Sequence, residues 1–221
     1  MPKIPIRLQP ITAEATVPLR HAILWPDLPI DKQLMPLDTL PTTRHFGAFI
    51  ALSEPGENIQ ELQGRDPSDP VLAIDQDYLP QAGECQLPVG VMTLCLEEFT
   101  NKGVLPTEIT AAGPTEIQLH KFAVLAALQG LGIGGQMIRQ VCQMLPTLDM
   151  DKAGSSGPSS EAGLKIPRPV LFHFHARKSQ REVYMHWGFA TLGDDVFLKR
   201  GPTGTGNPVE YIRMGRLITL G

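Results

Sequence analysis

Apolar and polar positions follow one another in two different rhythms along this chain, which predict strands in some segments and helices in others. Short runs that alternate, or that are apolar throughout, predict strands, because successive strand side chains point to opposite faces. The expected strands are 4–11, 45–52, 89–97, 116–124, 169–176, 189–199 and 209–217. Apolar residues three and four positions apart predict helices instead. The chain is therefore expected to form a mixed α/β fold.

Three segments have the helical spacing. The first follows Thr12, which can cap a helix, and it ends at Pro26. Its apolar stripe consists of Ala15, Leu19, Ala22 and Ile23. The stripe of the second consists of Ile133, Met137, Ile138, Val141, Cys142 and Leu145. The third covers 179–187, and Gly188 is suited to the left-handed position that follows a helix.

Segments rich in glycine, proline and serine interrupt this pattern. We interpret 53–88 as a long insertion in a hairpin, and 150–167 as a low-complexity insertion without a function of its own. Residues 100–114 are expected to form a turn-rich connection. A length of 221 residues suits one globular domain, so we expect a single domain over 1–221 that carries these insertions.

Composition narrows the class of protein. Hydrophobic residues make up 42% of the chain and charged residues 19%, and the formal net charge is −4. This charge gives no electrostatic reason to expect binding to nucleic acid or to an anionic membrane. The three cysteines form no CxxC pair, and the first residues contain no apolar leader segment. We therefore expect a cytoplasmic protein.

A glycine-rich segment separates the strand 116–124 from the helix that begins near Ile133. Its glycines are Gly130, Gly132, Gly134 and Gly135. Glycines allow backbone N–H groups to converge where a side chain would block a ligand. Because a helix begins directly afterwards, these amides are expected to bind an anion, most often a phosphate.

The segment matches two known kinds of phosphate loop poorly. It lacks the Gly-Lys-Ser/Thr of a Walker A loop. Gly130, Gly132 and Gly135 do match Gly-x-Gly-x-x-Gly, which is typical of dinucleotide-binding oxidoreductases. That pattern also needs a second strand that ends in an acidic residue. The next expected strand, 169–176, ends instead in histidines, so the oxidoreductase hypothesis is the weaker one.

Two motifs together resemble the GCN5-related N-acetyltransferase (GNAT) superfamily. The Gln-x-x-Gly-x-Gly at 129–134 is similar to the family's pyrophosphate loop. The Tyr-x-x-x-Gly-Phe at 184–189 resembles a signature on the family's next helix and turn. The last strand, around 209–214, resembles the ElaA-like branch. In element order the resemblance extends from about residue 4 to residue 218.

This resemblance implies a fold and a cofactor. The implied sheet is mostly antiparallel, has six to seven strands flanked by helices, and splays between 116–124 and 169–176. The implied cofactor is acetyl-CoA (coenzyme A), whose pantetheine arm would run along the strand before the loop, with the Val124 N–H near the thioester carbonyl. The residues implied to bind it are Phe122, Ala123, Val124, Gln129, Gly130, Leu131, Gly132, Ile133, Gly134 and Gly135.

The resemblance also implies direct transfer of an acetyl group to an amine. Tyr184 occupies the family's position for the general acid that protonates the departing sulfur. Alternatively, Tyr184 is a half-buried aromatic residue that packs on the core.

The base is less well defined. Gln118 stands where some family members have a glutamate. By strand alternation His120 shares a face with Gln118, Phe122 and Val124, so it is a candidate base or proton relay. The alternatives are Glu116, a water molecule, or a purely structural role for His120.

The acceptor implied by the resemblance is a primary amine of a small molecule. The alternatives are a protein or peptide N-acetyltransferase, and an acyl-CoA-binding module without catalysis. We expect no metal site, because the His-x-His at His173 and His175 has no further ligand near it in the sequence. The protein is expected to be a monomer or a homodimer.

Overall fold

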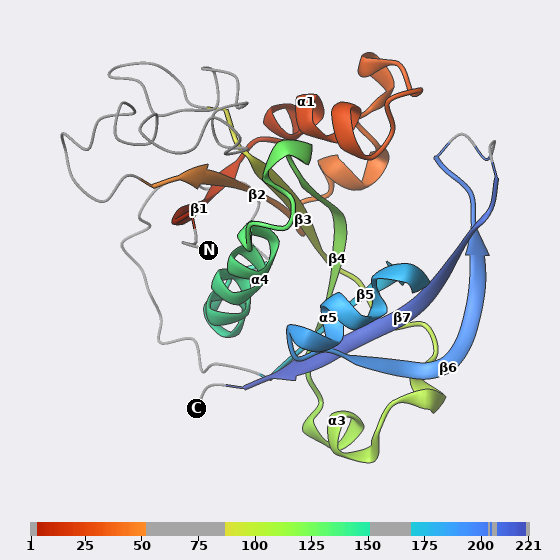
Figure 1. Ribbon diagram of the computed structural model, residues 1–221. Coiled ribbons are helices and arrows are strands. Elements are labelled where there is room, and N and C mark those ends of the chain that lie inside the picture. Colours follow the sequence, from red (N-terminus) through yellow and green to blue (C-terminus); the bar gives the residue numbers. More distant parts are fainter. Residues whose placement is uncertain (1–3, 52–86, 151–168, 203, 205–206, 220–221) are drawn as a thin grey trace. The chain divides into compact units, whose positions relative to one another are not determined.

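The computed structural model describes residues 4–51, 87–150, 169–202, 204 and 207–219 (Figure 1). The chain divides into two compact units, each made of separated segments. The first unit contains Met1–Met35, His45–Met92 and Lys121–Ile138, and the second contains Pro36–Arg44, Thr93–His120 and Arg139–Gly221. The expected insertions, 53–88 and 150–167, lie almost wholly outside the described residues.

The first unit is built on the N-terminal strands. Strand β1 (Ile6–Ile11) pairs antiparallel with β2 (Thr43–Ile50), with Ile6 opposite Ile50. Helix α1 (Ala13–Ile23) contributes Leu19 to a buried cluster with Val91 of β3 (Gly90–Leu96) and Ala123 of β4 (Thr115–Val124). This cluster fixes the part of β4 that leads into the glycine-rich loop.

Helix α1 begins where the sequence predicts but buries a different face. The Thr12 Oγ1 accepts a hydrogen bond from the Ala15 N–H at 3.3 Å, as expected of a capping threonine. Ala22 is exposed, however, whereas Arg20 is fully buried, with its Nη2 3.4 Å from the His45 Nδ1. The predicted stripe was wrong at Ala22 because an arginine whose guanidinium contacts other groups can be buried in place of an apolar residue.

Helix α4 (Ile133–Met144) follows the loop and has the predicted stripe. Its buried members are Ile133, Met137, Ile138 and Val141, and Leu145 follows directly, whereas Cys142 is only partly buried. Close packing of this face depends on Gly90, because a Cβ there would lie 2.6 Å from the Met137 Sδ. The start of α4, and with it the loop, is thereby positioned by packing.

The second unit is built around a long antiparallel hairpin, β6 (Ala190–Lys199) and β7 (Val209–Ile218) (Figure 1). Strand β7 also pairs antiparallel with β5 (Val170–Arg177). Helix α5 (Arg181–His186) lies against β5. A buried cluster of Phe99, Leu171 and Leu192 packs with Ile109 from α3 (Thr107–Ala112).

The described strands form one seven-stranded sheet in the order β1-β2-β3-β4-β5-β7-β6. Strands β4 and β5 are parallel, and they pair only from Thr115 opposite Val170 to Gln118 opposite His173. Both strands continue beyond that point, to Val124 and to Arg177. The predicted mixed sheet of six to seven strands and the separation of these two strands are confirmed.

Two local features differ from the expectations. The segment 100–114 contains the helix α3, which has six residues and is too short to show an apolar period. Within β4, Lys121 has a φ of +48°, a backbone conformation that residues other than glycine rarely adopt. Strand alternation therefore does not continue unbroken from His120 to Phe122 and Val124. Among the described helices, none is long and apolar enough to cross a membrane.

Candidate functional site

The glycine-rich loop of the first unit has a backbone that requires glycine at two positions. A short 3-10 turn, Ala126–Leu128, leads from β4 into the loop. Gly130 and Gly132 then each have a φ of +81°, a left-handed conformation that costs a residue with a Cβ about 1–2 kcal/mol. A Cβ at Gly130 would meet no heavy atom within 4 Å, so the space beside that residue is open.

Backbone amides gather at the start of α4. The first hydrogen bond of the helix runs from the Gln136 N–H to the Gly132 carbonyl, at 3.1 Å. Within the described part of the chain, no partner is found for the N–H groups of Gly130, Gly132, Ile133, Gly134 and Gly135. The four glycines are at least partly exposed, although Ile133 is buried. Such unpaired donors at a helix N-terminus favour an anion, so the loop fits a phosphate or pyrophosphate group.

Two further residues close the loop internally. The Gln129 Nε2 donates to the Val124 carbonyl at 2.9 Å, which ties the loop to the end of β4. The Leu131 N–H donates to the Leu128 carbonyl at 3.4 Å. In the strand before the loop, Ala123 is buried, whereas Phe122 and Val124 are partly exposed. The ten residues implied to bind the cofactor therefore form one continuous strand and loop within the first unit.

Tyr184 lies in the second unit, where the turn after α5 fixes its backbone. Gly188 has a φ of +85° and donates its N–H to the Met185 carbonyl at 2.9 Å. The Phe189 N–H donates to the Tyr184 carbonyl at 3.1 Å. These two bonds form a Schellman motif, in which glycine is the preferred left-handed residue. The Tyr-x-x-x-Gly-Phe spacing is therefore explained locally: it ends the helix and packs Tyr184 near Phe189.

The Tyr184 ring is held by aromatic neighbours. Its centroid lies 4.5 Å from that of Phe174, 5.3 Å from that of Trp187 and 6.4 Å from that of Phe189. Burial raises the pKa of the Tyr184 phenol to about 12, so the hydroxyl is protonated at neutral pH. Among the described residues, no hydrogen bond or ring contact joins Tyr184 to His120.

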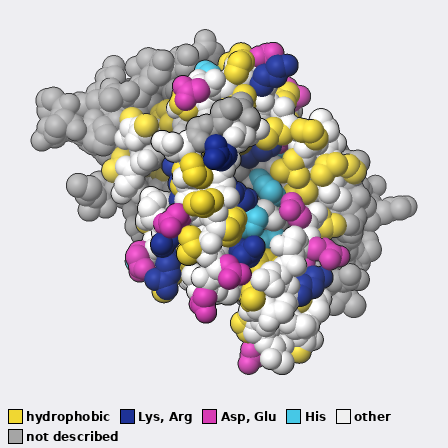
Figure 2. All heavy atoms as spheres, turned by 90° about the vertical axis from the view of Figure 1, so that its right-hand side faces the viewer, with side chains coloured by type: hydrophobic (Ala, Val, Ile, Leu, Met, Phe, Trp, Pro, Cys, Tyr) yellow, Lys and Arg dark blue, Asp and Glu magenta, His cyan; other side chains and the backbone are white. Residues whose placement is uncertain are grey.

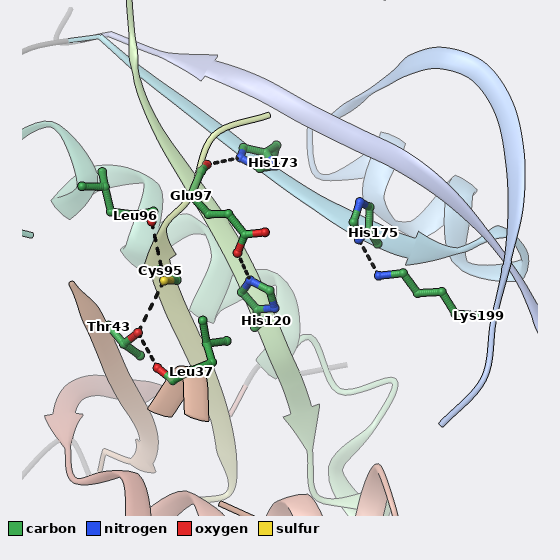
Figure 3. A network of polar contacts seen from close by, with 9 residues as sticks. All are labelled: Leu37, Thr43, Cys95, Leu96, Glu97, His120, His173, His175 and Lys199. Carbon is green, nitrogen blue, oxygen red and sulfur yellow. Dashed lines mark hydrogen bonds and ion pairs between the residues drawn. The ribbon is translucent and has the colours of Figure 1, made fainter. Parts of the chain in front are cut away.

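His120, the candidate base, belongs to a polar network of the second unit (Figure 3). Its Nε2 lies 3.0 Å from the Glu97 Oε2, and 23% of the His120 side chain and 41% of the Glu97 side chain are exposed. In turn, the His173 Nε2 donates to the Glu97 carbonyl at 2.9 Å, and burial lowers the pKa of His173. His120 is therefore paired with the carboxylate of a residue whose backbone carbonyl is held by His173.

The other candidate bases of β4 have different surroundings. The Glu116 Oε2 accepts a hydrogen bond from the Phe99 N–H at 2.6 Å, and its Oε1 lies 3.6 Å from the Lys102 Nζ. Both carboxylate oxygens of Glu116 thus hold the β3–β4 connection. Gln118 is buried and lies opposite His173. Of the residues considered as a base, His120 has the surroundings best suited to taking up a proton.

A second polar cluster lies on the hairpin and on β5. The Lys199 Nζ lies 2.6 Å from the His175 Nδ1 (Figure 3). Burial, and then the positive charges of Lys199 and Arg213, lower the pKa of His175 to about 4. His175 is therefore neutral at pH 7, and its Nδ1 accepts the hydrogen bond from Lys199. Among the described residues, no group of three or more His, Cys, Asp or Glu side chains could hold a metal ion.

Sequence reasoning did not identify Glu97, Lys199 or Arg213. Glu97 is the first residue after β3, and its N–H donates to the Glu116 carbonyl at 3.2 Å. That register depends on a connection of 100–114 that contains an unforeseen helix. The sequence offered one signal: Glu97 is a charged residue at the end of a predicted strand next to the central strand 116–124.

The chain has the fold of the GCN5-related N-acetyltransferases, as the two motifs predict. No family model and no curated protein matches the sequence. The structure resembles Escherichia coli ElaA with a TM-score of 0.50 and 14% identity, covering 96% of this chain and 99% of that chain. It also resembles Arabidopsis thaliana NAA60 in complex with acetyl-CoA, with a TM-score of 0.54 and 12% identity, covering 97% and 99% of the two chains. At these identities the likeness establishes the fold.

Proposed function

We propose that this protein is an acetyl-CoA-dependent N-acetyltransferase that acts on a primary amine of a small molecule. The observation that carries the proposal is the group of N–H groups without a partner in the described residues at Gly130, Gly132, Gly134 and Gly135, all on at least partly exposed residues between β4 and α4. A structure of NAA60, which has this fold, contains acetyl-CoA. That neighbour supports acetyl-CoA as the donor for this chain.

The first unit would hold the donor with its backbone. The amides of the glycine loop would bind the two phosphates of the pyrophosphate group, because they are unpaired at a helix N-terminus. Phe122, Ala123 and Val124 would receive the pantetheine arm, and the Val124 N–H would donate to the thioester carbonyl. When bound, acetyl-CoA supplies the acetyl group as a thioester.

The second unit would supply the base. An amine attacks only when it is neutral, so a proton has to be removed from the ammonium form. We assign this role to the His120 imidazole, with Glu97 accepting the Nε2–H and stabilising the imidazolium that forms. His120 immediately precedes Lys121 and Phe122 in β4, the strand that would also receive the donor.

Tyr184 is the proposed general acid. Its hydroxyl is protonated throughout the physiological range, because burial raises its pKa to about 12. A thiol has a pKa of about 8.5, so complete proton transfer to a free thiolate is uphill. The stabilisation would therefore come mainly from a charge-assisted hydrogen bond to the departing sulfur.

The experiment that tests the proposal combines binding with turnover. Coenzyme A is titrated into the protein by calorimetry, and thiol release from acetyl-CoA is measured against a panel of amines. We expect binding, loss of binding in Gly132→Glu, and amine-dependent thiol release. A chain that does not bind coenzyme A would contradict the proposal. Binding without acetylation of any amine would identify a non-catalytic acyl-CoA-binding module, and preference for peptide amines would identify a peptide N-acetyltransferase.

A further inference from the structure

Three basic residues share one face of the β5–β7–β6 part of the sheet in the second unit. His175 and Arg213 are directly opposite each other on β5 and β7, and Phe197 is opposite Tyr211 on β6 and β7. Lys199 is two residues after Phe197 and therefore points to the same face. We call His175, Lys199 and Arg213 the cation cluster.

The cation cluster contains hydrogen-bond donors without acceptors. Within the described ranges, Lys199 forms no ion pair with a carboxylate, and its one hydrogen bond goes to the neutral His175. Arg213 forms no hydrogen bond there, and its Nε is buried without a partner although only 20% of its side chain is exposed. Its nearest carboxylate oxygen, the Asp195 Oδ2, is 3.7 Å away on a side chain that is 68% exposed. Guanidinium N–H groups that are buried away from water are stabilised by an anionic hydrogen-bond acceptor.

Aromatic rings hold these cations in place. The Lys199 Nζ lies 5.6 Å from the ring centroids of both Phe197 and Tyr211, and the Arg213 guanidinium carbon lies 4.7 Å from that of Phe197. The His175 ring packs edge-on against Phe197 at 5.0 Å. Cation–π contacts of this kind position a charge without neutralising it. The two like charges remain close together, which an anion between them would stabilise.

The charge balance favours a carboxylate over a phosphate. Lys199 and Arg213 contribute two positive charges, and the carboxylates of Asp195 and Glu97 offset them only in part. What remains is matched by a single negative charge rather than by the two of a phosphate. The bidentate donors of a guanidinium also fit the two oxygens of a carboxylate.

An acidic group lies further along the same strand face. The Glu97 carbonyl is bound by His173, which is two residues before His175 on β5 and therefore on the same face. Figure 3 shows the Glu97–His120 and His175–Lys199 contacts as two separate pairs. Burial lowers the pKa of Lys199, and the negative charge of Glu97 partly offsets this shift. Figure 2 shows histidines on one face with basic and acidic side chains beside them. This face thus has an acidic end and a basic end.

We propose that the cation cluster binds the carboxylate of the acceptor, so that the acceptor is an amino acid whose amine is directed toward Glu97 and His120. The inference rests on the proposed acetyl transfer to a small amine. An ω-amino acid would place its amine at one end of this face and its carboxylate at the other, and the assay series identifies the chain length that fits.

The test compares acceptors that differ only in the carboxylate. The series β-alanine, 4-aminobutyrate and 6-aminohexanoate is assayed beside the corresponding ω-amino amides, and calorimetry measures binding of the same compounds to the protein without acetyl-CoA. We expect kcat/KM for the best acid to exceed that of its amide by at least about tenfold, as for one charge-assisted contact. Lys199→Met, which keeps an apolar stem on the rings, and Arg213→Lys should each reduce this ratio about tenfold. Lys178→Met removes an exposed cation paired with Glu210 and should leave the ratio unchanged.

The outcomes separate the inference from the proposed function. Equal kcat/KM for acids and amides would overturn the carboxylate subsite and leave the acetyltransferase intact. Absence of turnover with every amine would contradict the proposed function, and the calorimetric comparison would then decide the subsite alone. If the wild type, Lys199→Met and Arg213→Lys all bind the amino acids equally well, the inference is overturned, whether or not the protein acetylates an amine.

Discussion

Tyr184 makes two kinds of contact, one through its backbone and one through its ring. Its carbonyl accepts the Phe189 N–H that ends α5, and its ring packs on Phe174 and Trp187. Its hydroxyl, in contrast, takes part in no hydrogen bond within the described residues. The backbone and the ring therefore account for the contacts of Tyr184 within the described residues, and the proposed role of the hydroxyl is toward the acyl donor.

Tyr184→Phe separates these roles because it removes the hydroxyl and keeps the ring. Since the hydroxyl has no hydrogen-bond partner among the described residues, the free energy of unfolding should be nearly unchanged. If the hydroxyl is the general acid, kcat should fall about a hundredfold, with little change in the Kd of coenzyme A. Single-turnover kinetics and calorimetry on the same preparation measure both quantities. An unchanged kcat would remove Tyr184 as the acid and leave only its structural role.

The Glu97–His120 pair provides a second test at the residue scale. His120→Gln should lower kcat/KM about a hundredfold by removing the base. Glu97→Gln should have a smaller effect, about tenfold, and should shift the acidic limb of the pH–rate profile, because the charged partner of the imidazolium is lost. Glu97→Asp should restore part of the rate. The exposed His186→Gln is the matched control, and a Glu97→Gln profile that coincides with the wild type would contradict the positioning role of Glu97.

His175 should make stability depend on pH. Its folded pKa of about 4 lies below the ordinary value of 6.5, so the unfolded chain binds more protons between these values. The stabilisation is complete above pH 6.5 and is lost as the pH falls toward 4. Allowing for the partial exposure of the ring, the free energy of unfolding should fall by about 1 kcal/mol from pH 7 to pH 5 on this account. Urea unfolding of the wild type and of His175→Gln measures it, and an equal slope in both would exclude His175 as the source.

The loop between β4 and α4 can be tested as an element, because a left-handed glycine outside the loop provides a matched control. Gly130→Ala places a Cβ at a φ of +81° beside the unpaired amides. Gly113→Ala places one at a φ of +53° at the end of α3, also with no heavy atom within 4 Å. Both should cost about 1–2 kcal/mol of stability through backbone strain. Only Gly130→Ala should weaken coenzyme A binding, and equal weakening by both variants would mean that strain, rather than the loop, is responsible.

The elements also show how far the sequence determines this structure. Some features could be predicted because they depend on local backbone chemistry or on the spacing of apolar residues. They are the cap at Thr12, the left-handed Gly188 and the stripe of α4. The left-handed Lys121 and the helix α3 have no comparable local signal. The pairing of Glu97 with His120, and of Lys199 with His175, depends on strand register across long connections, so no spacing in the sequence reveals it.

At the scale of the whole molecule, the two units are joined through shared elements. Strands β2, β3 and β4 and helix α4 each contribute residues to both units. When one unit unfolds, it therefore disrupts four elements that also belong to the other unit. We infer that the chain behaves as a single domain with one cooperative transition, in line with the expectation from its length.

Coenzyme A should raise the midpoint of that transition. A ligand that binds only the folded state at about 100 times its Kd adds about 2.7 kcal/mol, which corresponds to roughly 5–10 °C for a chain of this length. Pantetheine lacks the pyrophosphate that the amides would bind, so at the same concentration it should raise the midpoint much less. Calorimetric scans with each ligand provide the comparison. An equal shift with both would show that the glycine loop does not bind the phosphates, and two separate transitions would show that the units unfold independently despite the elements they share.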